Sequence, residues 1–199
     1  MFPAEKDGIL YATLLADARF HELLLTIDCD LADAARAGRC RHCDGALHSA
    51  KFRRKPRGRG CKLGPEHDQR FSFCCAVDGC RGRETPASLR FLGRRVYVAA
   101  IVVLIAILQH GATDTRLARL SEVVNVDRRT VARWRTWWRD TFTAMSFWRI
   151  ARAQFMPPAD HDRLPASLIE RFTGNGAAPL IGMLRFLGPV TGGARMQAP

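Results

Sequence analysis

The chain has 199 residues, 47% of them hydrophobic and 25% charged, and its formal net charge is +12. This composition excludes a wholly disordered chain, and the longest apolar run, Val96 to Leu108, is shorter than the roughly twenty residues that span a bilayer. Residues 1–38 carry three cations and seven anions, whereas residues 39–95 carry fifteen cations and five anions. Residues 116–152 add nine cations and three anions. This uneven distribution predicts a surface that binds a polyanion.

The first predicted element is a helix over residues 9–37. Apolar side chains recur there mostly at steps of three and four residues, and Gly38 follows as a helix-ending residue. A break near Asp17 to Phe20 would divide this segment into two helices. Three acidic residues lack the glycine and glutamate of a calcium loop, so we interpret them as a solvated helix face: Asp28, Asp30 and Asp33.

Residues 38–95 lose the helical periodicity and become rich in Gly, Pro, Cys and Arg. The alternating sequence from Arg70 to Phe73 predicts a short strand. The stretch from Lys51 to Gly60 combines Pro and Gly with many like charges, which prevents a helix and predicts an extended basic loop.

Six of the seven cysteines lie between Cys40 and Cys80. No secretory leader is recognisable, so we expect a reducing compartment, where clustered thiols favour a metal over disulfides. Cys40 and Cys43 have the Cys-x2-Cys spacing at which two thiolates hold one tetrahedral ion. Cys75 and Cys80, with Asp78-Gly79 as turn residues before Cys80, supply a second pair about thirty residues later. This pattern is typical of a zinc ribbon holding one structural Zn²⁺.

The spacing leaves the choice of ligands partly open. Cys75 shares a strand face with Phe71 and Phe73, which favours it over Cys74 if the aromatic rings pack beside the metal. A catalytic zinc would keep one coordination position open beside an acid or base, and the signature of nucleobase deaminases is absent, so we expect no enzyme. The competing candidates for the fourth ligand are His48 and Cys61.

Val96 to Leu108 predicts a helix that is buried on all sides. The stretch from Leu120 to Trp134 then has the pattern of a helix-turn-helix. Its first helix covers about Asp114 to Val123, Asn125 stands at the tight turn, and Asp127 caps the second helix. Three residues of the second helix and its continuation are expected to face inward: Val131, Trp134 and Trp138.

The outward face of this second helix is basic. In a helix-turn-helix the N-terminal part of the recognition helix meets base edges in the major groove, where Arg pairs with guanine or holds phosphate. We therefore predict base-edge contacts with double-stranded DNA from Arg128, Arg129 and Arg133. We predict phosphate contacts from the cations of the basic loop: Arg53, Arg54, Lys55, Arg57 and Arg59.

The order of these segments resembles small zinc-ribbon and helix-turn-helix proteins of bacterial mobile elements, and the DNA-binding front end of transposases. The likeness covers about residues 20–150. It implies DNA binding at element ends or at a promoter, with a transposase or integrase as partner, and it carries over no catalytic residue. The segments that carry it, besides the first cysteine pair and the helix-turn-helix, are Phe52 to Gly58, Phe71 to Cys75, Cys80-Arg81 and Phe91 to Tyr97.

The predicted architecture is mainly α with a small β zinc ribbon. Its domains are an N-terminal helical segment (1–38), the zinc ribbon with its basic loop (39–95), a three-helix unit with the helix-turn-helix (96–155), and a partly disordered C-terminal helical tail (156–199).

The leading hypothesis is a sequence-preferring double-stranded DNA-binding accessory or regulatory protein of a mobile element, cytoplasmic and nucleoid-associated. The alternatives are an adaptor that docks a recombinase or RNA polymerase, and a truncated transposase module. RNA binding by the basic loop stays open, and so does the oligomeric state.

Overall fold

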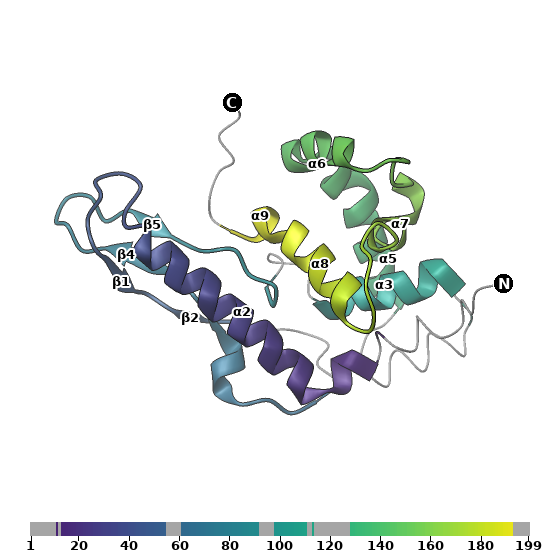
Figure 1. Cartoon of the computed structure of the whole chain (residues 1–199), viewed down its shortest axis with the longest axis horizontal. Coiled ribbons are helices and arrows are strands. Elements are labelled where there is room, and N and C mark those ends of the chain that lie inside the picture. The colour runs from purple at the N-terminus through teal and green to yellow at the C-terminus, as the bar shows by residue number, and fades with distance from the viewer. Residues whose placement is uncertain are drawn as a thin grey trace.

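The structure is a computed structural model, and it describes residues 11, 13–54, 61–91, 98–110, 113 and 128–192. It is mostly helical, with small antiparallel sheets toward one end of its long axis and most of the helices toward the other (Figure 1). The mainly α class with a small β part is therefore confirmed. The predicted first helix and turn of the helix-turn-helix fall in residues 114–127, outside the described residues.

Helix α2 (Ala18–Ala37) crosses the sheet end of the molecule and continues toward the helical end (Figure 1). It begins where the Asp17 carboxylate accepts a hydrogen bond from the backbone N–H of Arg19 at 2.9 Å, which is N-cap geometry. The expected break is confirmed at this residue. The helix ends at Gly38, and the left-handed conformation falls on the next residue, Arg39, with a φ of 58°.

Asp28 on α2 corrects one expectation. Its side chain is fully enclosed, with 0% of it exposed, instead of lying on a solvated face. It accepts hydrogen bonds from the Ser88 hydroxyl and from Nε of Arg90, the latter at 2.9 Å. These partners stand some sixty residues away in the chain, so the helical pattern around Asp28 could not reveal them. The other two aspartates of the set are exposed: Asp30 and Asp33.

The strands form two separate sheets. Strands β1 (Leu47–Ser49), β4 (Phe73–Cys75) and β5 (Arg83–Glu84) make an antiparallel sheet in the order β1-β4-β5. Strands β2 (Phe52–Arg53) and β3 (Gln69–Arg70) pair antiparallel beside it. The predicted strand from Arg70 to Phe73 is therefore divided between β3 and β4. A 3₁₀ turn, η1 (Pro65–Asp68), leads into β3.

Helix α3 (Val98–His110) lies in the larger core. Side chains from Ile101 to Ile107 are each at most 3% exposed, which confirms a helix buried on all sides. It packs on α5 (Arg128–Thr136) and α7 (Ala166–Ile169). The remaining elements of this part are η2, a π-helical segment (Trp137–Phe142), α6 (Ser146–Ala151), η3 (Arg152–Gln154), η4 (His161–Arg163), α8 (Ala178–Phe186) and α9 (Gly188–Thr191).

The segment expected as a C-terminal tail contributes to this same core. Leu168, Leu180 and Met183 are each 0% exposed and belong to the cluster that contains α3. The end of α9 also reaches the sheets, because buried Arg70 donates to the carbonyl of Thr191 at 3.2 Å. The domain boundaries stay a prediction, and residues 193–199 lie outside the described part of the chain. None of the helices described is long and apolar enough to cross a membrane.

Candidate metal centre

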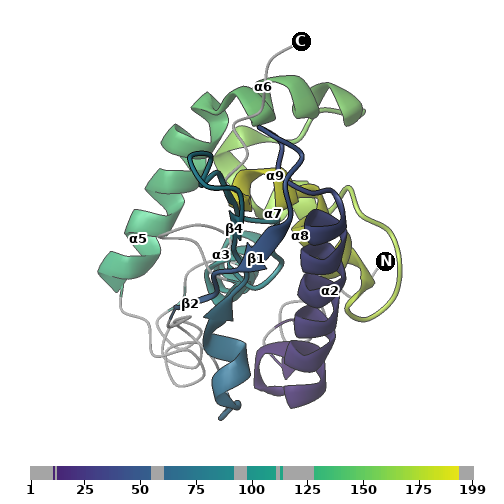
Figure 2. The same cartoon turned by 90° about the vertical axis from the view of Figure 1, so that its left-hand side faces the viewer.

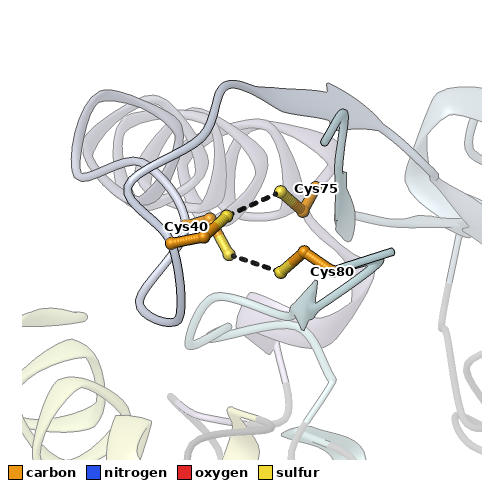
Figure 3. Close-up of side chains that lie close together, drawn as sticks. Cys40, Cys75 and Cys80 are labelled. Carbon is orange, nitrogen blue, oxygen red and sulfur yellow. Dashed lines mark hydrogen bonds between the residues drawn. The ribbon is translucent and has the colours of Figure 1, made fainter. Parts of the chain in front are cut away.

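Four cysteines from two loops converge on one point. Cys40 and Cys43 lie in the loop after α2. Cys75 ends β4 and Cys80 ends the turn before β5, and both face Cys40 (Figure 3). All four Sγ atoms lie within 4.8 Å of one another. The Cys40–Cys80 and Cys43–Cys75 sulfur distances are 3.7 and 3.4 Å. The sulfur–sulfur edge of a tetrahedral zinc site is about 3.8 Å when Zn–S is about 2.3 Å, so these four cysteines fit a metal ion.

None of the cysteines forms a disulfide. A disulfide would need two sulfurs about 2.05 Å apart, well below the distances within the cluster. Four thiolates around one tetrahedral ion leave no open coordination position, which is the arrangement of a structural metal rather than a catalytic one.

The two cysteine loops share one backbone design. The N–H of Cys40 donates to the carbonyl of Gly45 at 3.0 Å, and the N–H of Cys75 donates to the carbonyl of Gly82 at 2.8 Å. In each loop the residue before the glycine is left-handed, with φ values of 55° at Asp44 and 45° at Arg81. Two halves of unequal length, Cys-x2-Cys and Cys-x4-Cys, therefore present their sulfurs in the same way.

The glycines of these loops lie against the sulfur atoms. A Cβ on Gly45 would stand 3.0 Å from Sγ of Cys75, and one on Gly82 would stand 3.3 Å from Sγ of Cys40. A Cβ would also stand 2.5 Å from Cγ2 of Val77 at Gly45 and 2.8 Å from Cδ2 of His42 at Gly82, so a side chain at either position would displace these neighbours and crowd the sulfur atoms. Sequence reasoning overlooked Gly82; the signal was the repeated spacing, since each second cysteine is followed two residues later by glycine.

Each sulfur accepts a hydrogen bond from the backbone N–H two residues further along the chain. The donors are His42 for Cys40, Gly45 for Cys43, Val77 for Cys75 and Gly82 for Cys80. Such donors favour the thiolate, which is the metal-binding form.

The four thiols differ in acidity. The N–H of His42 is the largest influence on Cys40 and lowers the pKa of that thiol to about 6. The corresponding donor also lowers the pKa of each of the other three, but hydrogen bonds between neighbouring sulfurs and desolvation outweigh it. The pKa values of Cys43, Cys75 and Cys80 are consequently raised above the ordinary 9.0.

These shifts predict how many protons zinc displaces. Near neutral pH Cys40 is largely ionised and the other three thiols are protonated, so binding should release about three protons per zinc. Zinc affinity should fall as the pH is lowered, with one further proton competing once the pH passes below about 6. Calorimetric titrations in buffers of different ionisation enthalpy measure this count. A zinc affinity that does not change with pH would contradict the four-thiolate centre.

The competing ligand candidates lie outside the cluster. Cys75 belongs to it and Cys74 does not, as the aromatic face predicted: Phe71 and Phe73 pack with Cys75 in the small core of the sheets. Sγ of Cys74 approaches the carbonyl of Arg81 at 3.9 Å instead. The two other candidates are also absent from the cluster: His48 and Cys61.

The predicted DNA-contact residues are partly described. Arg129 and Arg133 are exposed on α5, whose opposite side buries Val131 and Trp134. Arg128 begins α5, but its side chain is outside the described set. In and after β2, Arg53 is exposed and Arg54 is half-buried, with its N–H bonded to the Asp68 carbonyl at 2.7 Å. The remaining predicted contacts fall in residues 55–60, which the structure does not describe: Lys55, Arg57 and Arg59.

The chain was compared with protein-family models, curated proteins and solved structures. None of them matches it. The likeness to mobile-element proteins therefore stays a prediction, and the chemistry of the four-cysteine centre follows from the centre's own geometry.

Proposed function

We propose that this protein is a non-enzymatic, sequence-preferring double-stranded DNA-binding accessory or regulatory protein of a mobile element. The observation that carries the proposal is the exposed face of α5. Within the described part of the chain, neither Arg129 nor Arg133 forms an ion pair with a carboxylate, while the same helix buries Val131 and Trp134. A cationic helix face without acidic partners is suited to DNA phosphates and guanine edges.

The arrangement of the molecule supports a single binding face. Seen along the long axis, β2 and α5 lie on the same side and α2 lies on the other (Figure 2), while along that axis β2 lies toward the sheet end and α5 toward the helical end (Figure 1). The exposed side chains of α2 include two arginines and three carboxylates, so its surface is weakly negative; its fourth carboxylate, Asp28, is buried and paired with Arg90. A duplex on the β2 and α5 side would meet the basic segments and avoid the acidic helix.

The metal has a supporting part in this proposal. A zinc ion held by the four cysteines would supply folding free energy to the sheets and no reaction chemistry. Fixing these short strands gives β2 and the cations around it a defined position beside the duplex. The chain's own residues, Arg53 among them, then hold the phosphates.

Arg129→Ala and Arg133→Ala should each relax the base preference of the protein. Each change should cost roughly 1–3 kcal/mol of binding to the preferred site, if the guanidinium pairs bidentately with a base. Selection of binding sites from random duplexes, followed by anisotropy titrations, measures both effects. Arg149→Ala is the matched control, because Arg149 is also exposed on a helix, α6, but outside the proposed face.

Two outcomes would contradict this assignment. Unchanged affinity and base preference in both variants would remove α5 from the role of reading helix. Failure of the zinc-loaded protein to bind any duplex would overturn DNA binding itself and favour the adaptor, whose basic surface docks an acidic protein.

A further inference from the structure

A pocket of about 260 Å³ lies beside the proposed reading helix. One wall comes from α5 and η2, with Arg135, Thr136 and Arg139. The other wall comes from the η4 turn, with His161 and Asp162. Part of the first wall is π-helical, and π-helical turns inside helices are frequent at functional sites.

The imidazole of His161 is held in one tautomer. Nε1 of Trp148, a residue only 1% exposed, donates to Nε2 of His161 at 3.3 Å. An indole N–H is a donor only, so Nε2 must accept and the neutral ring carries its proton on Nδ1. In this tautomer the Nδ1–H is a hydrogen-bond donor, and His161 is one of the residues that line the pocket.

The η4 wall is anchored by its own hydrogen bonds. The Asp160 carboxylate accepts from the backbone N–H of Asp162 at 3.0 Å, and the Ser167 hydroxyl donates to the Asp160 carbonyl at 2.6 Å. Ser167 is itself buried in α7. This turn therefore holds His161 in a defined place opposite α5.

The charges of the pocket are mixed, and Arg135 is the least compensated. Arg139 donates to the Asp140 carboxylate at 2.6 and 3.0 Å, which neutralises part of its charge. Arg135 is exposed and has no carboxylate partner within the described part of the chain. Asp162 is the acidic side chain of the lining. Its carboxylate would repel an anionic ligand and attract a cationic one. Removing this charge by substitution should therefore strengthen the binding of an anion and weaken the binding of a cation.

The pocket stands at a suitable distance from the base-reading residues. An α-helix rises 1.5 Å per residue, so Arg135 lies about 9 Å along α5 from Arg129. Thr136, seven residues beyond Arg129, is on the same helix face. The major groove is about 12 Å wide. Arg135 itself lies about 120° around the helix from Arg129, since successive residues are about 100° apart, so the pocket flanks the reading face. If Arg129 reaches base edges within the groove, a phosphate at the groove border is the group nearest this flank.

We infer that this pocket binds one backbone phosphate of the DNA duplex, with Arg135, Thr136 and His161 as donors. The inference rests on the proposed DNA binding and adds a contact that fixes how far α5 enters the groove. A guanidinium beside hydroxyl and imidazole donors matches the oxygens of a phosphate.

The test compares two substitutions with opposite expected effects. Arg135→Ala should weaken binding to preferred and random duplexes by the same factor, about tenfold, and should reduce the salt slope by about one. Asp162→Asn should strengthen binding to both, because it removes repulsion of the phosphate. The controls are Arg149→Ala on α6 and Asp30→Asn on α2, which change charge away from the pocket. Anisotropy titrations of the zinc-loaded protein over a range of salt concentrations give all of these values.

Each outcome separates this inference from the proposed function. Opposite shifts in the two pocket variants, larger than in their controls and with base preference unchanged, support the phosphate pocket. If Arg135→Ala binds duplex DNA with unchanged affinity, or if Asp162→Asn binds it more weakly, the pocket does not bind a phosphate. Either result leaves the proposed DNA binding intact. Absence of duplex binding by the unaltered protein overturns both.

Discussion

Cys40→Ser should release the metal and unfold the small sheets. The strands β1 to β5 are only two or three residues long, and their core is a small cluster that itself contains Cys40 and Cys75. Structural zinc contributes roughly 10–16 kcal/mol of apparent binding free energy in small domains, far more than such a core supplies. Metal analysis of protein purified without chelator should give about one zinc per chain, lost in the variant. In amide NMR spectra, the signals of the sheet residues should lose their chemical-shift dispersion.

Cys74→Ser is the matched control for this experiment. Cys74 neighbours Cys75 in β4 but lies outside the four-sulfur cluster, so its loss should leave zinc content and sheet structure unchanged. If neither the unaltered protein nor the control contains zinc, the prediction of a structural zinc site is wrong. Equal zinc loss in the Cys40 and Cys74 variants would show that the cluster is assigned to the wrong thiols.

Asp28→Ala should destabilise the protein by about 3–5 kcal/mol, the cost of removing one partner from a buried ion pair. The Asp28 and Arg90 side chains are 0% and 6% exposed, and their atoms are 2.9 Å apart. Arg90 also donates to the carbonyls of His67 and Gln69, so the network joins α2 to η1 and β3. Without the carboxylate the guanidinium would be buried with no counter-charge. Urea unfolding followed by circular dichroism measures the change in the free energy of unfolding.

Asp33→Ala on the same helix provides the comparison. Asp33 is exposed, so its removal should change the free energy of unfolding by no more than about 0.5 kcal/mol. A double substitution, Asp28→Ala with Arg90→Ala, should cost less than the sum of the two single changes, because the pair is lost only once. Equal effects of Asp28→Ala and Asp33→Ala would show that the buried network contributes nothing particular to stability.

Local sequence favoured the four cysteines of the cluster, and the structure then excluded Cys74, His48 and Cys61 from it. Spacing identified Cys40, Cys43 and Cys80, and the alternation of Phe71, Phe73 and Cys75 selected Cys75 over Cys74. Both inferences depend on geometry within a few residues, a tight turn or a strand pleat, which the chain specifies by itself. The same holds for α3, whose apolar side chains leave no polar face and so require burial on all sides.

Long-range pairing was invisible to the same reasoning. Arg70 was expected in an ordinary strand, yet its guanidinium is buried and donates to the carbonyls of Pro86 and Thr191. Desolvation lowers the pKa of this guanidinium to about 10. Its partners stand up to 121 residues away in the chain. No periodicity connects such positions, because a helix or strand repeat describes only neighbours on one element.

The sequence alone therefore predicted the mainly helical class and the four-cysteine cluster, since these depend on residue type and short spacing. Only the tertiary structure decided that Asp28 is a buried anchor and that residues around Leu168 and Met183 belong to the core of α3. It also decided that Arg135 and His161 line one pocket. Burial and pairing of polar groups depend on which distant segments meet, and that choice is made by the packing of the whole chain.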